Sequence, residues 1–135
     1  VFQDYKLLPD RNLFENIALP LHVMGFSSNQ IASRVDEAIE LVGLEGKESH
    51  FPKELSGGEQ QRASLARAFI KEPDIILADE PTGNLDPVAS FELVRLLETI
   101  NETGTTVLMA SHNYNLIKGR GRPIFELKNG ILRVR

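Results

Sequence analysis

The chain has 135 residues, of which 41% are hydrophobic, and this is enough apolar material for the core of one compact domain. Its formal net charge of −4 and the lack of an interleaved basic and aromatic pattern disfavour nucleic acid as a partner. The absence of cysteine excludes a disulfide framework and a thiolate metal site, and no apolar run approaches the length of a bilayer-spanning helix.

The first elements expected along the chain are the end of a strand and a short helix. Val1-Phe2 reads like the end of a buried strand, and because the chain begins without methionine we expect it to be the C-terminal part of a longer polypeptide. Asn12 and Glu15 have the spacing of a helix capping box. Pro20 is expected to end or kink the helix that follows.

Two further helices are predicted before the second half of the chain. Ser27 and Gln30 form a second capping box, and an apolar residue at every third or fourth position supports a helix up to a stop at Gly43. Good helix formers then run from Glu59 to about Lys71, where Pro73 follows.

The second half predicts a parallel sheet. The apolar run at residues 75–78 fits a strand covered on both faces, as in parallel sheets. A helix over about residues 89–100 and a strand at residues 106–110 come next. Strand, helix and strand in this order indicate a right-handed parallel crossover.

The C-terminal segment predicts an antiparallel hairpin and carries a basic tail. Residues 124–127 and 131–134 flank Asn129-Gly130, a two-residue signal for a type I′ turn. Residues 118–135 carry 6 basic and 1 acidic side chains, against 9 basic and 18 acidic side chains before them. We interpret this tail as a solvated surface, with anionic lipid or a partner protein as the alternative; its basic residues are Lys118, Arg120, Arg122, Lys128, Arg133 and Arg135.

The motif LSGGEQQR at residues 55–62 indicates an anion site at a helix start. The two adjacent glycines, Gly57 and Gly58, let the backbone approach a phosphate closely. Ser56 and the free amides of the first helical turn supply hydrogen-bond donors.

Two carboxylates at a strand end indicate a second kind of chemistry. Asp79 and Glu80 close the apolar run, and the carboxyl ends of parallel strands usually build the site in such sheets. We expect Asp79 to bind magnesium, directly or through water, and a solvated loop with two acidic residues is the alternative. Glu80, on the opposite side if the strand continues, is expected to accept a proton from an attacking water. Asp86 is expected to cap the next helix, with Pro87 in its first turn.

Two more polar residues follow apolar segments. His112 comes after the strand that ends at Ala110, so we expect it at the same sheet edge as Asp79, within reach of a γ-phosphate. Gln3 can orient water or complete a magnesium shell as an uncharged ligand. An ordinary surface position is the alternative for both side chains.

Taken in order, these motifs resemble the nucleotide-binding domain of ABC ATPases. Gln3, LSGGEQQR, IILADE at 75–80, NLD at 84–86 and His112 correspond to the family's Q-loop, signature motif, Walker B with its catalytic glutamate, D-loop and H-loop. The resemblance implies an α/β fold of the P-loop NTPase type, with a parallel sheet core, a helical subdomain and a C-terminal β-hairpin. Residues 1–135 would form a partial ABC ATPase domain, with a helical and signature part at about 12–72 and the remaining motifs at 73–135.

The resemblance also implies roles for the motif residues. ATP hydrolysis with Mg²⁺ would use Glu80, His112 and Gln3 as catalytic residues, and Asp79 and Gln3 would hold the metal. Two domains would pair head to tail as a homodimer, in which the residues that contact ATP are Ser56, Gly57, Gly58, Glu59 and Asp86.

An integral membrane partner is the second implied partner. The resemblance places the protein in the cytoplasm, at the inner face of the cell membrane. The motif contexts are most similar to the branch of the family that comprises cell-division ATPases and lipoprotein- or macrolide-export ATPases. The segment 4–30 is the expected contact, with apolar anchors at Leu7, Leu8, Leu13 and Phe14.

The chain departs from the family pattern at one point. It contains no G-x-x-x-x-G-K-[ST] phosphate loop, because Glu48 follows its only Gly-Lys pair, Gly46-Lys47, and position 41 is leucine. The aromatic residue that stacks on adenine is also expected upstream. We therefore expect these 135 residues alone neither to bind ATP tightly nor to hydrolyse it.

Two other classes of protein are the alternatives. SMC- or Rad50-like ATPases share the signature and Walker B motifs, but only 51 residues separate Gln3 from Leu55, too few for their long coiled coil. A non-catalytic binding or structural module is the other alternative, and the missing phosphate loop supports it for this chain.

Overall fold

The computed structural model describes all 135 residues. The elements in chain order are α1 (Leu13–Val23), α2 (Ser28–Leu41), the 3-10 turn η1 (Pro52–Glu54), α3 (Gly57–Phe69), β1 (Ile75–Asp79), α4 (Pro87–Glu102), β2 (Thr106–Ala110), α5 (Tyr114–Ile117), β3 (Phe125–Lys128) and β4 (Ile131–Val134). The predicted α/β class, with a parallel sheet, helices and a C-terminal hairpin, is confirmed. No helix combines the length and the apolar composition that crossing a bilayer requires.

Both predicted capping boxes are present. The Asn12 side chain accepts a hydrogen bond from the Glu15 amide at 2.8 Å, and the Glu15 carboxylate accepts one from the Asn12 amide at 3.0 Å. Ser27 and Gln30 make the same reciprocal pair before α2. Because these bonds satisfy amides that a helix start leaves free, α1 and α2 begin where the sequence predicts.

Pro20 does not end α1. The helix continues to Val23, and the Met24 amide donates to the Pro20 carbonyl at 3.0 Å. Proline removes one amide donor, but the buried Leu21 holds the last turn in the hydrophobic core. The expected helix end at Pro20 is therefore wrong, because tertiary packing outweighs the lost hydrogen bond.

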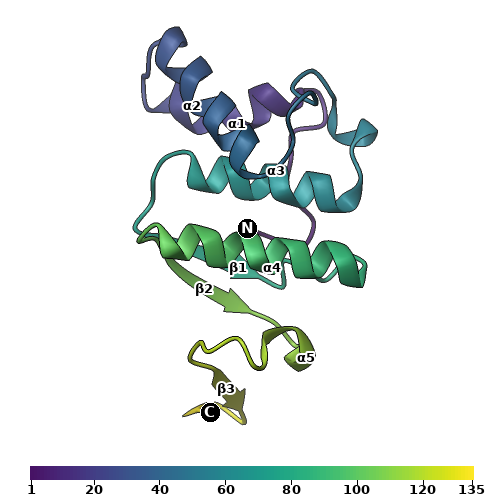
Figure 1. Cartoon of the computed structure of the whole chain (residues 1–135), viewed down its shortest axis with the longest axis vertical. Coiled ribbons are helices and arrows are strands. Elements are labelled where there is room, and N and C mark those ends of the chain that lie inside the picture. The colour runs from purple at the N-terminus through teal and green to yellow at the C-terminus, as the bar shows by residue number, and fades with distance from the viewer.

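Two hydrophobic clusters form the core, and α3 contributes to both. The larger lies among α1, α2 and α3; it includes Leu13, which is 1% exposed and so is not the surface anchor that the sequence suggested. The smaller joins α4 and β1 to α3 through Leu65. In Figure 1, α3 accordingly lies between the α1–α2 pair and the layer of α4 and the sheet.

The sheet is covered on one face. β1 and β2 are parallel, with Asp79 opposite Ala110. Ile76 is 3% exposed and packs with α4, whereas Ile75 and Leu77 on the other face are 50% and 59% exposed. The expectation of a strand covered on both faces is wrong for this chain, because its helices pack against one face only.

The predicted hairpin is confirmed. Lys128 pairs with Ile131, which leaves Asn129 and Gly130 as a two-residue turn. Both turn residues have a positive φ, 51° and 76°, as a type I′ turn requires.

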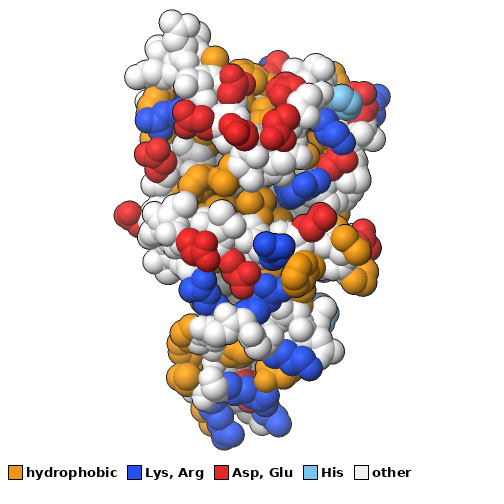
Figure 2. Space-filling view, viewed as in Figure 1, with side chains coloured by type: hydrophobic (Ala, Val, Ile, Leu, Met, Phe, Trp, Pro, Cys, Tyr) orange, Lys and Arg blue, Asp and Glu red, His pale blue; other side chains and the backbone are white.

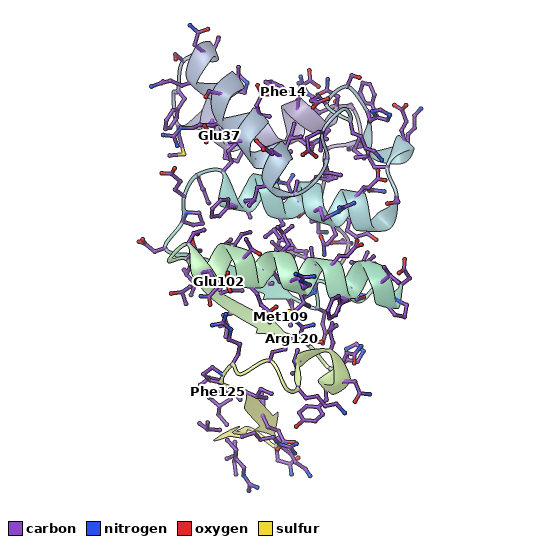
Figure 3. The ribbon with its side chains drawn as sticks, viewed as in Figure 1. Phe14, Glu37, Glu102, Met109, Arg120 and Phe125 are labelled. Carbon is purple, nitrogen blue, oxygen red and sulfur yellow. The ribbon has the colours of Figure 1, made fainter.

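Basic side chains gather at this end of the molecule (Figure 2). Arg120 is nevertheless anchored: its Nη1 lies 2.9 Å from Glu98 Oε2 of α4, and 16% of its side chain is exposed. Figure 3 shows Arg120 at the junction between α4 and the hairpin. Arg135 also pairs with Glu126, at 2.9 Å. Two of the basic residues of the tail therefore form ion pairs within the chain.

Candidate functional site

Three segments of the chain end at one edge of the sheet. β2 pairs with one side of β1, and residue 1 pairs with the other side. The Val1 ammonium donates to the Leu77 carbonyl at 2.8 Å, and the Asp79 amide donates to the Val1 carbonyl at 3.0 Å. Gln3 and His112 follow these segments in the chain. Both residues therefore lie at the sheet edge where β1 ends at Asp79.

Glu80 leaves the strand and turns toward the end of β2. Its backbone is left-handed, with φ of 44°, and its amide donates to the Ala110 carbonyl at 2.9 Å. Its Oε1 lies 3.0 Å from His112 Nδ1. The strand ends at Asp79, so Glu80 does not take the opposite-side position of a continuing strand. Left-handed backbone costs a glutamate about 1 to 3 kcal/mol, and such residues concentrate at functional sites.

The Glu80 and His112 side chains are open to water. The histidine side chain is 84% exposed and the glutamate side chain 28% exposed. A carboxylate in hydrogen-bond contact with an imidazole, at the end of two parallel strands, can accept a proton from a water that enters the edge.

Gln3 is held against the loop that follows β1. Its Nε2 donates to Asn84 Oδ1 at 3.1 Å, and Asn84 Nδ2 donates to the Gln3 carbonyl at 3.2 Å. A methyl carbon added at Gly83 would lie 2.5 Å from Gln3 Cδ, so the close approach requires glycine there. No hydrogen bond within the chain occupies Gln3 Oε1, which leaves this oxygen for a ligand.

The Asp79 carboxylate and the Gln3 amide supply oxygen ligands of the kind that magnesium takes. The Asp79 carboxylate makes no ion pair, and it is on the exposed face of β1. No group of three or more His, Cys, Asp or Glu side chains forms a site made by protein alone. Magnesium usually takes one or two protein ligands and completes its shell with water and phosphate oxygens, and this pair meets that requirement.

The LSGGEQQR segment starts α3. Ser56 is its N-cap and accepts a hydrogen bond from the Glu59 amide at 3.2 Å. Gly57 and Gly58 are the first helical residues, so α3 begins two residues earlier than the sequence suggested. A methyl carbon at Gly57 would lie 2.8 Å from the Tyr5 hydroxyl, and one at Gly58 would lie 3.1 Å from a side chain of α4. The helix start therefore has the free amides and the dipole that favour an anion.

Lys47 neutralises the acidic residue in the first turn of α3. Its Nζ lies 2.6 Å from Glu59 Oε1. The hydrogen bond from Lys47 holds the pKa of the Glu59 carboxyl below its usual value. The lysine of the Gly46-Lys47 pair thus binds a carboxylate of its own chain, and it reduces the repulsion that Glu59 would exert on an anion at this helix start.

Asp86 caps α4 as expected. Its Oδ1 accepts hydrogen bonds from the Val88 and Ala89 amides at 2.9 and 3.0 Å. The glycines of the α3 start lie against Leu85 and Ala89, on either side of this cap.

The structure thus arranges the candidate residues in two groups. Glu80 and His112 are in direct contact, and Gln3 and Asp79 lie at the same edge. The α3 start, residues 56–59, lies beside the Asp86 cap. No hydrogen bond or ion pair joins the two groups directly.

No role was predicted for three polar residues that the structure places in contact with residues of these groups or with their immediate neighbours in the chain. Asn84 lies within the quoted NLD motif, but no role was predicted for its side chain. Gln61 lies four residues before the buried Leu65, and this helical spacing is the signal that would have placed an amide on a buried face. Lys47 lies 12 residues from Glu59 across a loop, and no periodic signal marks the pair.

Comparison with known proteins identifies the family. A family model described as ABC transporter matches residues 1–83. The chain belongs to the ABC transporter family. The resemblance to ABC ATPases is therefore confirmed, and the matched range includes Gln3, the LSGGEQQR motif and the Asp79-Glu80 pair.

Curated ABC relatives match nearly the whole chain. The cell division ATP-binding protein FtsE of Streptococcus pneumoniae (strain D39) is 51% identical over 130 residues, which is 96% of this chain and 56% of the relative. FtsE of Bacillus subtilis is 48% identical over 98% of the chain and 58% of its own length, and FtsE of Escherichia coli K12 is 48% identical over 98% and 60%. The chain therefore spans little more than half the length of these relatives.

Solved ABC structures share the fold. The ATP-binding cassette MJ0796, in a dimeric post-hydrolysis state bound to ADP and Pi, has a TM-score of 0.74 and 37% identity, and the match covers 85% of this chain and 53% of that one. The cbiO1 protein of Clostridium perfringens, part of the ABC transporter complex cbiONQ, has a TM-score of 0.79 and 30% identity, with 87% and 47% coverage.

Proposed function

We propose that the protein is the ATP-hydrolysing subunit of an ABC-type membrane complex that acts in cell division. The observation that carries the proposal is the contact between Glu80 and His112, at 3.0 Å, at the sheet edge where Asp79 and Gln3 also lie. The names of the FtsE relatives support the cell-division role. The dimeric, ADP- and Pi-bound neighbour supports the nucleotide chemistry.

In the proposed mechanism, Glu80 orients the attacking water and accepts its proton. The exposed His112 steadies the carboxylate through Nδ1 and donates to the γ-phosphate as negative charge develops there. Asp79 and the free Oε1 of Gln3 would hold Mg²⁺, which neutralises charge on the phosphate oxygens when bound. Asn84 and Gly83 keep the Gln3 amide at the edge.

The α3 start is proposed to act across a head-to-tail homodimer. Ser56, Gly57, Gly58 and Glu59 would contact the nucleotide held by the partner subunit, and Asp86 would lie beside them at the interface. The separation of these residues from Glu80 within one chain supports this reading, because a single chain does not unite both groups. The dimeric state of the MJ0796 structure supports it independently.

The membrane partner is proposed to be an FtsX-like integral membrane protein, which would place the complex at the inner face of the cell membrane. The segment 4–30 is the proposed contact. Its exposed apolar residues support this, since Leu8, Val23 and Met24 are 39%, 81% and 55% exposed. Apolar side chains at such exposure provide anchors for a partner.

Two alternatives to the cell-division role have specific discriminators. A lipoprotein- or macrolide-export ATPase of the same branch would be indicated by co-purification with an exporter instead of an FtsX-like protein. A non-catalytic module would be indicated by a full-length protein that binds no ATP. An SMC- or Rad50-like role is disfavoured, because Gly25 and Gly43 interrupt the helices between Gln3 and Leu55.

Calorimetric titration with Mg-ATP tests the proposed function. We expect the full-length protein to bind and hydrolyse ATP, and the 135 residues alone to show no binding in the low micromolar range, because they lack a phosphate loop. A full-length protein that fails to hydrolyse ATP, both alone and with its membrane partner, would remove the proposal.

A second prediction concerns the fit of Gln3 over Gly83. In the full-length protein, we expect Gly83→Ala to push the Gln3 amide off the edge and to lower the hydrolysis rate about tenfold or more, since small displacements of positioning groups cost rate steeply. A double-mutant cycle with Gln3→Ala separates this effect from a general loss of stability. Once Gln3 is shortened, Gly83→Ala should cause little further loss, and additive effects would contradict the assigned contact.

A further inference from the structure

Gln61 is a polar side chain in a buried part of α3. The residue is 0% exposed, as are Ala63 and Leu65 of the same helix. Its Nε2 donates two hydrogen bonds, while its Oε1 is buried without any partner. A buried acceptor without a donor is destabilising, so a side chain that served packing alone would be better replaced by an apolar one.

The two hydrogen bonds of Gln61 join it to the two backbone segments that carry Gln3 and Glu80 of the proposed hydrolytic site. Gln61 Nε2 donates to the Phe2 carbonyl at 2.8 Å and also to the Pro81 carbonyl. Phe2 immediately precedes Gln3, and Pro81 immediately follows Glu80. No other side chain makes hydrogen bonds to both backbone segments.

The chemistry of the partners requires a hydrogen-bond donor at this position. Both partners are carbonyl oxygens, so only the NH₂ end of the amide can face them, and a rotated amide would place Oε1 against two acceptors. Methionine has a similar length but no donor. A glutamate side chain can donate only when its carboxyl group is protonated.

We infer that Gln61 is a positioning residue of the hydrolytic site, whose amide fixes both the Gln3 segment and the Glu80 segment to α3. This inference rests on the proposed function. There, the start of α3 faces the nucleotide of the partner subunit. The Phe2 and Pro81 carbonyls are hydrogen-bonded to the same side chain of α3, so a shift of the helix relative to that nucleotide moves both segments. Gln61 thereby links the two nucleotide sites of the dimer.

The test measures steady-state ATP hydrolysis by full-length Gln61→Met and Gln61→Glu between about pH 6 and about pH 9. Gln61→Met should lower kcat about tenfold or more while the dissociation constant for Mg-ATP stays within about twofold, since the nucleotide contacts remain and only the placement of Gln3 and Glu80 suffers. For Gln61→Glu, burial raises the pKa of the new carboxyl, which donates while it is protonated. Its kcat relative to wild type should therefore fall as the pH rises, whereas the ratio for Gln61→Met should be flat.

Asn101→Leu is the matched control. Asn101 is in α4, and its side-chain amide Nδ2 donates to the Thr105 carbonyl at 2.9 Å, at the opposite end of the sheet from Asp79 and Ala110. We expect this variant to stay within about twofold of wild type, and thermal unfolding to show that all three variants are folded.

Two results would overturn the inference: a wild-type kcat for Gln61→Met, or a Gln61→Glu ratio that does not change with pH. The second readout decides the matter even where Gln61→Met proves unstable. Glu80→Gln, measured alongside, separates this failure from that of the proposed function. If Glu80→Gln is inactive while both Gln61 variants behave as wild type, hydrolysis at this edge stands and only the role of Gln61 is rejected.

Discussion

Glu80→Gln in the full-length protein is expected to lower ATP hydrolysis about a hundredfold or more, the scale of a positioned general base. The amide keeps the size and polarity of the side chain and can still contact His112, but it cannot accept a proton from water. Because Ser56 and the other proposed nucleotide contacts are unchanged, ATP binding and ATP-driven dimer formation should persist. Single-turnover hydrolysis and calorimetric binding measure the two properties separately.

Glu72 supplies a matched control for this substitution. Like Glu80, it is a glutamate with a left-handed backbone, φ 52°, but its side chain is 78% exposed and lies 3.9 Å from Arg34. Glu72→Gln should leave the rate within about twofold of wild type, because exposed ion pairs contribute little. Turnover of Glu80→Gln within about threefold of wild type would remove Glu80 from the role of base.

Ser56→Arg is expected to abolish the ATP-driven dimer while each subunit still binds nucleotide. Ser56 is exposed at the start of α3, so a long side chain there would enter the space of the partner's γ-phosphate and displace the free amides of the first turn from it. Size-exclusion chromatography with Mg-ATP, in a Glu80→Gln background that cannot hydrolyse, reports the dimer directly.

Two comparisons isolate the interface from the helix cap. Ser56→Ala removes the same hydroxyl cap, at a cost of about 1 kcal/mol, without adding bulk, and we expect it to weaken the dimer much less than Ser56→Arg does. Ser27→Arg makes the same change at the other serine N-cap, which accepts from the Gln30 amide at 3.3 Å on α2. An undiminished dimer peak for Ser56→Arg would mean that the α3 start does not face a nucleotide across an interface.

The features that the sequence predicts well are those that neighbouring residues decide. The Asn12-Glu15 box and the Asn129-Gly130 turn depend on side chains and φ preferences within four residues, and both are present. Predicting that His112 lies at the same sheet edge as Asp79 required one further inference, that β1 and β2 pair in parallel. Such predictions need periodicity and strand polarity but no knowledge of packing.

The features that sequence reasoning missed depend on segments far apart in the chain. Pro20 stays helical because of core packing around Leu21, and the turn at Glu80 depends on a hydrogen bond to the end of β2. The bonds of Gln61 span 59 and 20 residues. Contacts of this kind leave no periodic trace, and only the folded backbone brings their partners together.

The position of α3 between two hydrophobic clusters has a consequence for how the molecule opens. Residues such as Ala66 are buried on one side of the helix against α1 and α2, while Leu65 is buried on the other side against α4 and β1. Either cluster can loosen while the other still holds the helix. Beyond its free first turn, we therefore expect the hydrogen-bonded amides of α3 to exchange with solvent only when both clusters open together, and to be among the slowest-exchanging amides of the fold.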